Sequence, residues 1–360
     1  MRYLSPAFAL LTLAACGEPQ VEVDTLDAPG PYAVGVRTLE VEYRPPLTLE
    51  TRTLQTVVWY PAEAAEGERP FYVLRSSEVA TIDAPPLTLG PRPVVVFSHG
   101  HQAYAAAMSR IMEHLASHGY VVIAPTHTGN TFLDGDNRET DIYYLRTYDL
   151  KAALDHVAGL GDGLSALVSE TRVVAGHSFG AYTAFAVAGA EYPVDDLDDG
   201  CAAGTVSSGY CSTLDDEKRD LFASGFEDDR FSAVLSYDPG DFGLFGEAGV
   251  AKVDVPTLHV VAEISGHPVG DPAADDYWRS LNHPDDFRFL LKGGDHNDFT
   301  DACEAGLDVR CSTLIPERVW SATRIYTLAF LDGVVLGEPG YEDILSGAVE
   351  VSSLVEVTDR

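Results

Sequence analysis

Positive charge is scarce in this sequence of 360 residues, which holds 23 Lys and Arg against 56 Asp and Glu. The formal net charge of −33 gives a surface that repels phosphate backbones, so we expect no nucleic-acid partner. Internal repeats and a strong linker are also absent, which favours one domain over two. With 46% hydrophobic residues, a chain of this length can bury the core of one large α/β domain.

Spacings typical of metal sites are missing as well. No Cys-x-x-Cys occurs, and the acidic runs that begin at Asp195, Asp215 and Glu227 lack the spacing of a calcium loop. His99 and His101 form a His-x-His pattern, but no third ligand stands nearby in the sequence. We interpret these two histidines as locally hydrogen-bonded and expect neither a metal nor a cofactor.

The N-terminus has the features of a targeting segment. Arg2 precedes an apolar stretch over residues 7–15, and Leu13-Ala14-Ala15-Cys16-Gly17 resembles a bacterial lipobox. We therefore predict a signal peptide over 1–15, lipidation of Cys16 and a tether over 16–31. The stretch is too short to remain as a membrane span, so the lipid on Cys16 would hold the protein at a membrane surface. This predicts a bacterial cell-envelope protein, anchored in the outer membrane; an ordinary cleaved signal would make it secreted.

Four cysteines remain once Cys16 is set aside, and an even number outside the cytosol predicts disulfides. Three connectivities are open. We favour the close pairs Cys201–Cys211 and Cys303–Cys311, each joining the ends of a polar loop.

Strand-like and helix-like segments alternate along the chain. Apolar runs or alternation predict strands over 32–41, 51–59, 93–97, 120–124, 172–175, 231–237, 257–262 and 287–291, and helical spacing predicts helices over 104–117, 141–159 and 319–331. This alternation predicts an α/β domain over 32–335, with a mainly parallel sheet and helices on both faces. We interpret residues 191–230 as an acidic insertion that lies over the sheet edge facing the active site. Residues 336–360 are predicted to form a C-terminal tail.

The most informative motif is Gly176-His177-Ser178-Phe179-Gly180, which follows an apolar run and precedes a small-residue helix. In this context Ser178 is expected on a sharp turn between a strand and a helix, exposed as a nucleophile. Side chains at Gly176 and Gly180 would collide with the neighbouring backbone. A serine hydroxyl needs a base, and the base needs an acid that orients it.

Four histidines follow Ser178. His259 lies within a predicted strand, and His267 and His283 precede prolines in loops. We favour His296 as the base because it follows the last predicted strand, in a glycine-containing loop that can return to the sheet edge.

The acid has three candidates. Asp238 closes the strand over 231–237, whereas Glu263 and Asp271 flank the end of the next strand. The arrangement Gly-x-x-Asp, typical of an acid at that later position, is missing there, and Ser265 stands where its aspartate would be. We favour Asp238; its alternative role is to start a turn before Pro239.

The oxyanion of a tetrahedral intermediate requires two backbone N–H donors. Phe179, directly after the serine, would supply one of them. His101 would supply the other, because Gly100 lets the loop after the strand over 93–97 approach closely.

Five segments together resemble a known family: Val96-Phe97-Ser98-His99-Gly100, Leu115-Ala116-Ser117-His118-Gly119-Tyr120-Val121-Val122, Gly176-His177-Ser178-Phe179-Gly180, Asp238-Pro239 and His296-Asn297-Asp298-Phe299. They look like plasma-type platelet-activating factor acetylhydrolase and its bacterial dienelactone-hydrolase-like relatives, in the α/β-hydrolase superfamily. The likeness covers most of residues 32–332. It implies an α/β-hydrolase fold and an acid after the strand that follows the serine's helix, which supports Asp238. The chain departs from the family at His101, where an apolar residue is typical, and in the insertion.

The resemblance implies a serine ester hydrolase that cleaves short-chain or oxidised acyl esters, with a small-molecule or lipid ester as its partner. Two alternatives remain open. A polyester or dienelactone-type hydrolase would use the same fold and the same residues. A surface-anchored binding protein would not need an activated serine.

Overall fold

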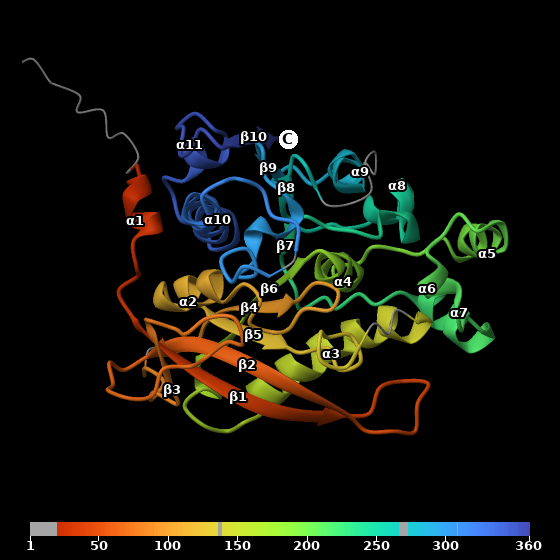
Figure 1. The fold of residues 1–360 in the computed structure, drawn as a ribbon, viewed down its shortest axis with the longest axis horizontal. Coiled ribbons are helices and arrows are strands. Elements are labelled where there is room, and N and C mark those ends of the chain that lie inside the picture. The colour runs from red at the N-terminus through yellow and green to blue at the C-terminus, as the bar shows by residue number, and fades with distance from the viewer. Residues whose placement is uncertain (1–19, 89, 136–138, 266–272, 308) are drawn as a thin grey trace, which may run out of the picture.

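The computed structural model describes residues 20–88, 90–135, 139–265, 273–307 and 309–360, which form a 10-stranded sheet (Figure 1). In spatial order its strands are β10 (Val355–Asp359), β9 (Phe287–Leu291), β8 (Thr257–Ala262), β7 (Val234–Tyr237), β6 (Val168–His177), β4 (Arg92–Ser98), β5 (Val121–Pro125), β2 (Arg52–Ala62), β1 (Ala33–Tyr43) and β3 (Ala80–Ile82).

The central strands from β5 to β9 all run parallel. β2 joins β5 antiparallel and β1 joins β2 antiparallel, whereas β10 joins β9 antiparallel at the other edge. The prediction of a mainly parallel sheet is therefore confirmed. Because the carboxyl ends of parallel strands share one edge, the loops after β4, β6, β7 and β9 converge there.

Helices cover both faces of the sheet, as predicted. Strand β4 explains why: Val95 and Phe97 point into one core, and Val94 and Val96 into the other. The first core is closed by α2 (Ser109–Ser117), α10 (Pro316–Phe330) and α11 (Glu342–Leu345), and the second by α3 (Thr140–Ala158), α4 (Phe179–Val187), α8 (Gly246–Val250) and α9 (Ala273–Ser280). A strand buried on both faces needs an uninterrupted apolar run, which β4 has.

Both ends of the described chain contact the domain. In the predicted tether, α1 (Val23–Asp27) packs beside α10, with Leu26 buried and Asp27 bonded to Arg324 at 2.6 Å (Figure 1). Residues 336–360, predicted as a tail, contain α11 and β10, and β10 extends the sheet. A five-residue strand is too short for its alternation to stand out in a sequence. Cys16 lies outside the described residues, and no helix among those described is long and apolar enough to cross a bilayer.

The acidic insertion differs from its prediction. It forms α5 (Val194–Ala203), α6 (Ser208–Cys211) and α7 (Asp216–Ser224), on the outer side of α3 and α4. Tyr192, Tyr210 and Phe222 are buried there among aromatic rings that include Tyr143 and Tyr182. These rings hold the insertion against the helices. None of the described residues that line the cavity around Ser178 comes from 191–230.

Candidate active site

Ser178 lies at the junction of β6 and α4 with φ 57° and ψ −122°. Such backbone angles are strained for a residue with a side chain and cluster at active sites. Both flanking glycines are needed, as predicted. A Cβ on Gly176 would overlap the backbone of Gly180, and a Cβ on Gly180 would overlap the carbonyl of Ser98. The half-buried Ser178 lines a cavity at the carboxyl edge of the sheet.

His296 and Asp238 meet at the same edge. His296 Nδ1 lies 2.5 Å from Asp238 Oδ2, and the Asp238 side chain is fully buried. The carboxylate also accepts the backbone N–H of Ala262 at 3.1 Å and the hydroxyl of Ser265 at 3.0 Å. Donation from Nδ1 to a carboxylate leaves Nε2 as the acceptor nitrogen of the neutral imidazole. The geometry thus presents an oriented imidazole in the cavity that contains Ser178.

A short 3-10 helix, η3 (His296–Phe299), fixes the position of the histidine. Asp295 starts it with a capping box in which its N–H donates to Asp298 Oδ2 at 2.9 Å. His177 donates from Nε2 to the His296 carbonyl at 2.9 Å, and the two rings lie 4.7 Å apart. The residue between Gly176 and Ser178 therefore contacts the loop of the candidate base.

The other candidates lie elsewhere. His259 is fully buried within β8 and does not line the cavity. Glu263 is exposed and accepts the N–H of Gly293 at 2.7 Å. His283 accepts a backbone N–H from its own loop, and His267 and Asp271 lie outside the described residues.

The loop after β4 passes beside Ser178. A Cβ on Gly100 would come 3.3 Å from Ser178 Cβ, so the glycine permits a close approach. His101 lines the cavity, and its Nδ1 lies 3.0 Å from the amide nitrogen of Asn130. Phe179 is the first residue of α4, and its ring faces His101 at 6.3 Å. Both residues predicted to supply oxyanion donors therefore adjoin the serine.

His99 controls the orientation of this loop. Its Nε2 accepts the backbone N–H of His127 at 2.9 Å, and a backbone N–H can only donate. Complete burial, and after it the proximity of His127 and Arg146, hold the pKa of His99 well below 6.5, so the ring is neutral and carries its proton on Nδ1. That Nδ1–H donates to the Gly100 carbonyl at 2.7 Å. In a trans peptide the N–H of His101 points the opposite way from this carbonyl.

A second serine–histidine–aspartate array lies beneath the loop. His127 Nε2 lies 2.9 Å from Ser98 Oγ, and His127 Nδ1 lies 2.8 Å from Asp149 Oδ2. All three side chains are fully buried. Burial lowers the pKa of His127 to about 3, and Arg52 keeps the pKa of Asp149 below its usual range against the opposing effect of its burial. The array is therefore a neutral imidazole between a hydroxyl and an ionised carboxylate.

The cavity around Ser178 has a volume of about 900 Å³. One wall comes from the loops after β4 and β7, including Gln102 and Phe242, and another from the loop after η3, including Leu307 and Val309. These loops surround the serine with a mixture of apolar and polar groups.

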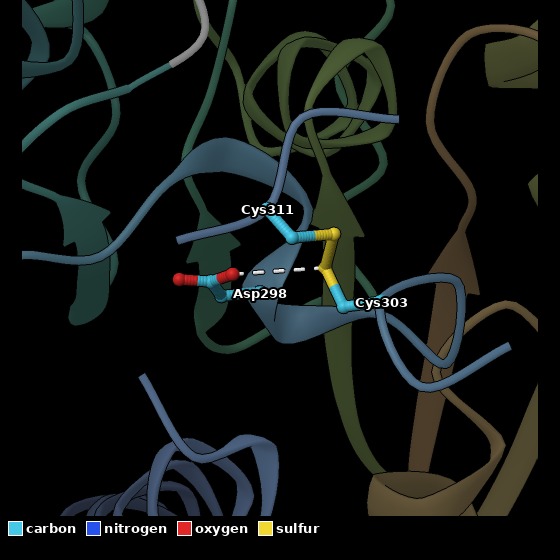
Figure 2. A group of neighbouring side chains, drawn as sticks. All are labelled: Asp298, Cys303 and Cys311. Atoms are coloured by element: carbon cyan, nitrogen blue, oxygen red, sulfur yellow. Dashed lines mark hydrogen bonds between the residues drawn. A yellow bond between two sulfur atoms is a disulfide. The ribbon is translucent and has the colours of Figure 1, made fainter. Parts of the chain in front are cut away.

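Two disulfides join Cys201 to Cys211 and Cys303 to Cys311, the pairs favoured from the sequence. Figure 2 shows the Asp298 carboxylate beside the second disulfide, where Oδ1 lies 3.6 Å from Cys303 Sγ. Asp298, Cys303 and Cys311 form the one cluster with metal-ligand spacing among the described residues. Because both sulfurs are bonded to each other, neither is a thiolate ligand. The same carboxylate oxygen accepts the Ser312 N–H at 2.9 Å, so the cluster holds the cavity loop together.

Sequence reasoning missed several residues of this site. Ser265 stands in the sequence where an aspartate is expected, and in the structure its hydroxyl contacts Asp238 from the next loop. His177 could have been found from the sequence, because it lies inside the motif from Gly176 to Gly180. No sequence motif indicates His127 and Asp149, which pair between a loop and a helix 22 positions apart.

Comparisons with known proteins agree with this architecture. A family model described as Chlorophyllase matches residues 75–196, about a third of the chain. A ferulic acid esterase from Streptomyces cinnamoneus is similar in structure, with a TM-score of 0.67 and 22% identity over 92% of this chain and 98% of that one. No curated protein matches the chain. The strand order, the turn at Ser178 and this structural likeness show that the chain has an α/β-hydrolase fold.

Proposed function

We propose that the protein is a serine carboxylic-ester hydrolase with Ser178 as nucleophile, His296 as base and Asp238 as the orienting acid. The observation that carries the proposal is the 2.5 Å contact between His296 Nδ1 and the buried Asp238, at the cavity that both His296 and Ser178 line. A hydroxyl is a weak nucleophile without such a base. The structural neighbour named as an esterase and the match to the Chlorophyllase model support the same class of reaction.

In the first step Ser178 Oγ attacks the ester carbonyl carbon, and its proton passes to His296 Nε2. The carbonyl oxygen becomes an oxyanion, which the N–H groups of Phe179 and His101 stabilise. The intermediate collapses to an acyl-enzyme, and the alcohol leaves with the proton from His296. Water then repeats the attack with His296 as base, releasing the carboxylic acid and restoring Ser178.

For the substrate we propose short-chain or oxidised acyl esters, including the sn-2 acetyl ester of a phospholipid, from the resemblance to platelet-activating factor acetylhydrolase. We keep polyester and dienelactone-type substrates as the alternative on the same residues. Acetyl, butyryl and long-chain esters, with and without phosphocholine groups, would rank these classes by kcat/KM.

The proposal is tested by hydrolysis of p-nitrophenyl acetate and by labelling with a fluorophosphonate probe. Wild-type protein should do both, and Ser178→Ala should do neither. Ser224→Ala, at an exposed position in α7, is the matched control and should behave as wild type. A binding protein without an activated serine would show no turnover and no labelling. Turnover retained by Ser178→Ala would refute the proposed nucleophile.

We also propose that Cys16 carries the lipid that places the enzyme at the bacterial cell envelope. The support is the lipobox-like sequence Leu13-Ala14-Ala15-Cys16. Radiolabelled palmitate should enter the wild-type protein, and Cys16→Ser should abolish the label and release the protein from the membrane fraction. An unlabelled wild-type protein would point to secretion instead.

A further inference from the structure

A second groove, of about 400 Å³, adjoins the Ser178 cavity. The two share Val73, Tyr104 and Phe132, so they lie side by side with these three residues between them. Its far part runs over β1 and β2, where it is lined by residues such as Val36 and Val57. A substrate whose ester lies at Ser178 would have to cross these three shared residues to reach the groove.

Exposed apolar side chains gather along this path. Leu133 is 82% exposed, Phe71 70%, Phe132 47%, Val73 45% and Ile82 38%, and all five line the groove. With two more on the Ser178 cavity, they make up half of the large apolar side chains exposed in the described part of the chain. Scattered exposed apolar residues are ordinary, whereas a contiguous group beside a reactive site indicates a binding surface.

The charges along the path select against anions. The described residues that line the two hollows include the carboxylates of Asp83, Asp241 and Asp276 but no Lys or Arg. The whole chain carries a net charge of −33. In the groove itself the charged side chain among the described lining residues is Asp83, which lies 3.4 Å from Arg37 Nε. An anionic group there would meet a carboxylate, and the nearby arginine is already paired with it.

We propose that this groove is a subsite for an uncharged, apolar arm of the ester, one long enough to extend from Ser178 beyond Phe132. The proposal rests on the ester hydrolysis proposed above and names the class of substrate. The arm belongs to the acyl or to the alcohol half of the ester, and in both cases the same apolar contacts with Phe71 and Leu133 bind it.

The experiment compares kcat/KM for three esters below their aggregation concentrations. p-Nitrophenyl acetate is short in both halves, p-nitrophenyl octanoate extends the acyl half, and 4-phenylbutyl acetate extends the alcohol half. The double variant Phe71→Ser, Leu133→Ser removes two exposed side chains whose loss should not disturb the core. Leu49→Ser is the matched control, since Leu49 is 90% exposed and lines neither hollow.

We expect the double variant to lower the ratio of extended-ester to acetate kcat/KM by about tenfold or more, a loss in the range measured for missing apolar contacts in a pocket. The ester that shows the loss identifies the half that carries the arm, and Leu49→Ser should leave both ratios unchanged. Unchanged ratios in the double variant would overturn the proposal. So would a loss seen only with esters held in phosphatidylcholine vesicles, which would assign the surface to membrane docking.

Failure of the subsite and failure of the proposed function give different results. If the proposed function is wrong, either the wild type hydrolyses none of the three esters or Ser178→Ala hydrolyses them as wild type does. If only the subsite is wrong, Ser178→Ala is inactive while the double variant matches wild type on every ester.

Discussion

Replacing Asp238 by asparagine isolates the role of one negative charge in the candidate site. The backbone N–H of Ala262 donates to Oδ1, so the asparagine must keep its carbonyl oxygen at that position. Its NH₂ group then occupies the place of Oδ2, facing His296 Nδ1. An NH₂ group can only donate there, which forces the imidazole proton onto Nε2. In this tautomer His296 cannot accept the proton of Ser178.

The expected loss follows from that tautomer. A triad aspartate changed to asparagine lowers kcat by about 10⁴, which corresponds to about 5.4 kcal/mol of barrier. Ser265→Ala removes one donor to the carboxylate but keeps the charge and the bond to His296, so its loss should be about tenfold or less. Glu263→Gln should have no effect, because Glu263 bonds elsewhere.

The assay is steady-state hydrolysis of p-nitrophenyl butyrate, with thermal unfolding to show that each variant is folded. We expect KM to change little in Asp238→Asn, since the aspartate does not line the cavity. A folded Asp238→Asn with more than a tenth of the wild-type kcat would refute the reasoning and would mean that another group orients His296.

Three further predictions concern the loop, the disulfide and the response to acid. His99→Phe should lower kcat by about 10- to 100-fold with little change in KM, because the Gly100 carbonyl loses its shortest hydrogen bond and the oxyanion donor is less well held; equal kcat would contradict this. Removing Cys303–Cys311, with its sequence separation of 8, should lower the free energy of unfolding in urea by about 2.5 kcal/mol, and an unchanged midpoint would contradict it. Burial lowers the pKa of His114 in the folded protein to about 3 from its ordinary value of 6.5. Between these two pH values the unfolded chain binds a proton that the folded protein does not, so the native state is destabilised as the pH falls from 6.5 to about 3. In this pH range His114→Gln should reduce the slope of the free energy of unfolding against pH by about 1.4 kcal/mol per pH unit. Identical slopes in the two proteins would show that His114 does not contribute.

Much of the central sheet could be predicted because its strands are buried on both faces. Val94 to Phe97 and Val121 to Ala124 are continuous apolar runs, which the chain can place only between two layers of helices. The strands and helices at the edges of the fold have weaker sequence patterns. Strand β10 has five residues at the edge, partly exposed, and its pairing with β9 depends on a partner more than sixty positions earlier.

The insertion over residues 191–230 could not be predicted for a different reason. Its sequence is acidic and lacks a clear apolar period, yet Tyr192, Tyr210 and Phe222 are buried. A few large aromatic side chains hold three short helices against α3 and α4, and such spacing follows the shape of the surface they contact rather than a helical period. The direction in which the insertion folds could therefore not be read from residues 191–230 alone.

The two serine–histidine–aspartate arrays of this fold explain why residue types alone do not locate a catalytic site. Ser98, His127 and Asp149 have hydrogen-bond distances typical of a triad, but all three side chains are fully buried and no substrate can reach them. His127 is also held neutral, with its pKa lowered to about 3, so taking a proton there would charge a fully desolvated ring. Ser178 differs because its strained turn lifts it to the edge of the sheet, where a cavity meets a partly exposed His296. Exposure of the hydroxyl and room for an ester thus separate the proposed catalytic array from the buried one, and only Ser178 should react with a fluorophosphonate probe.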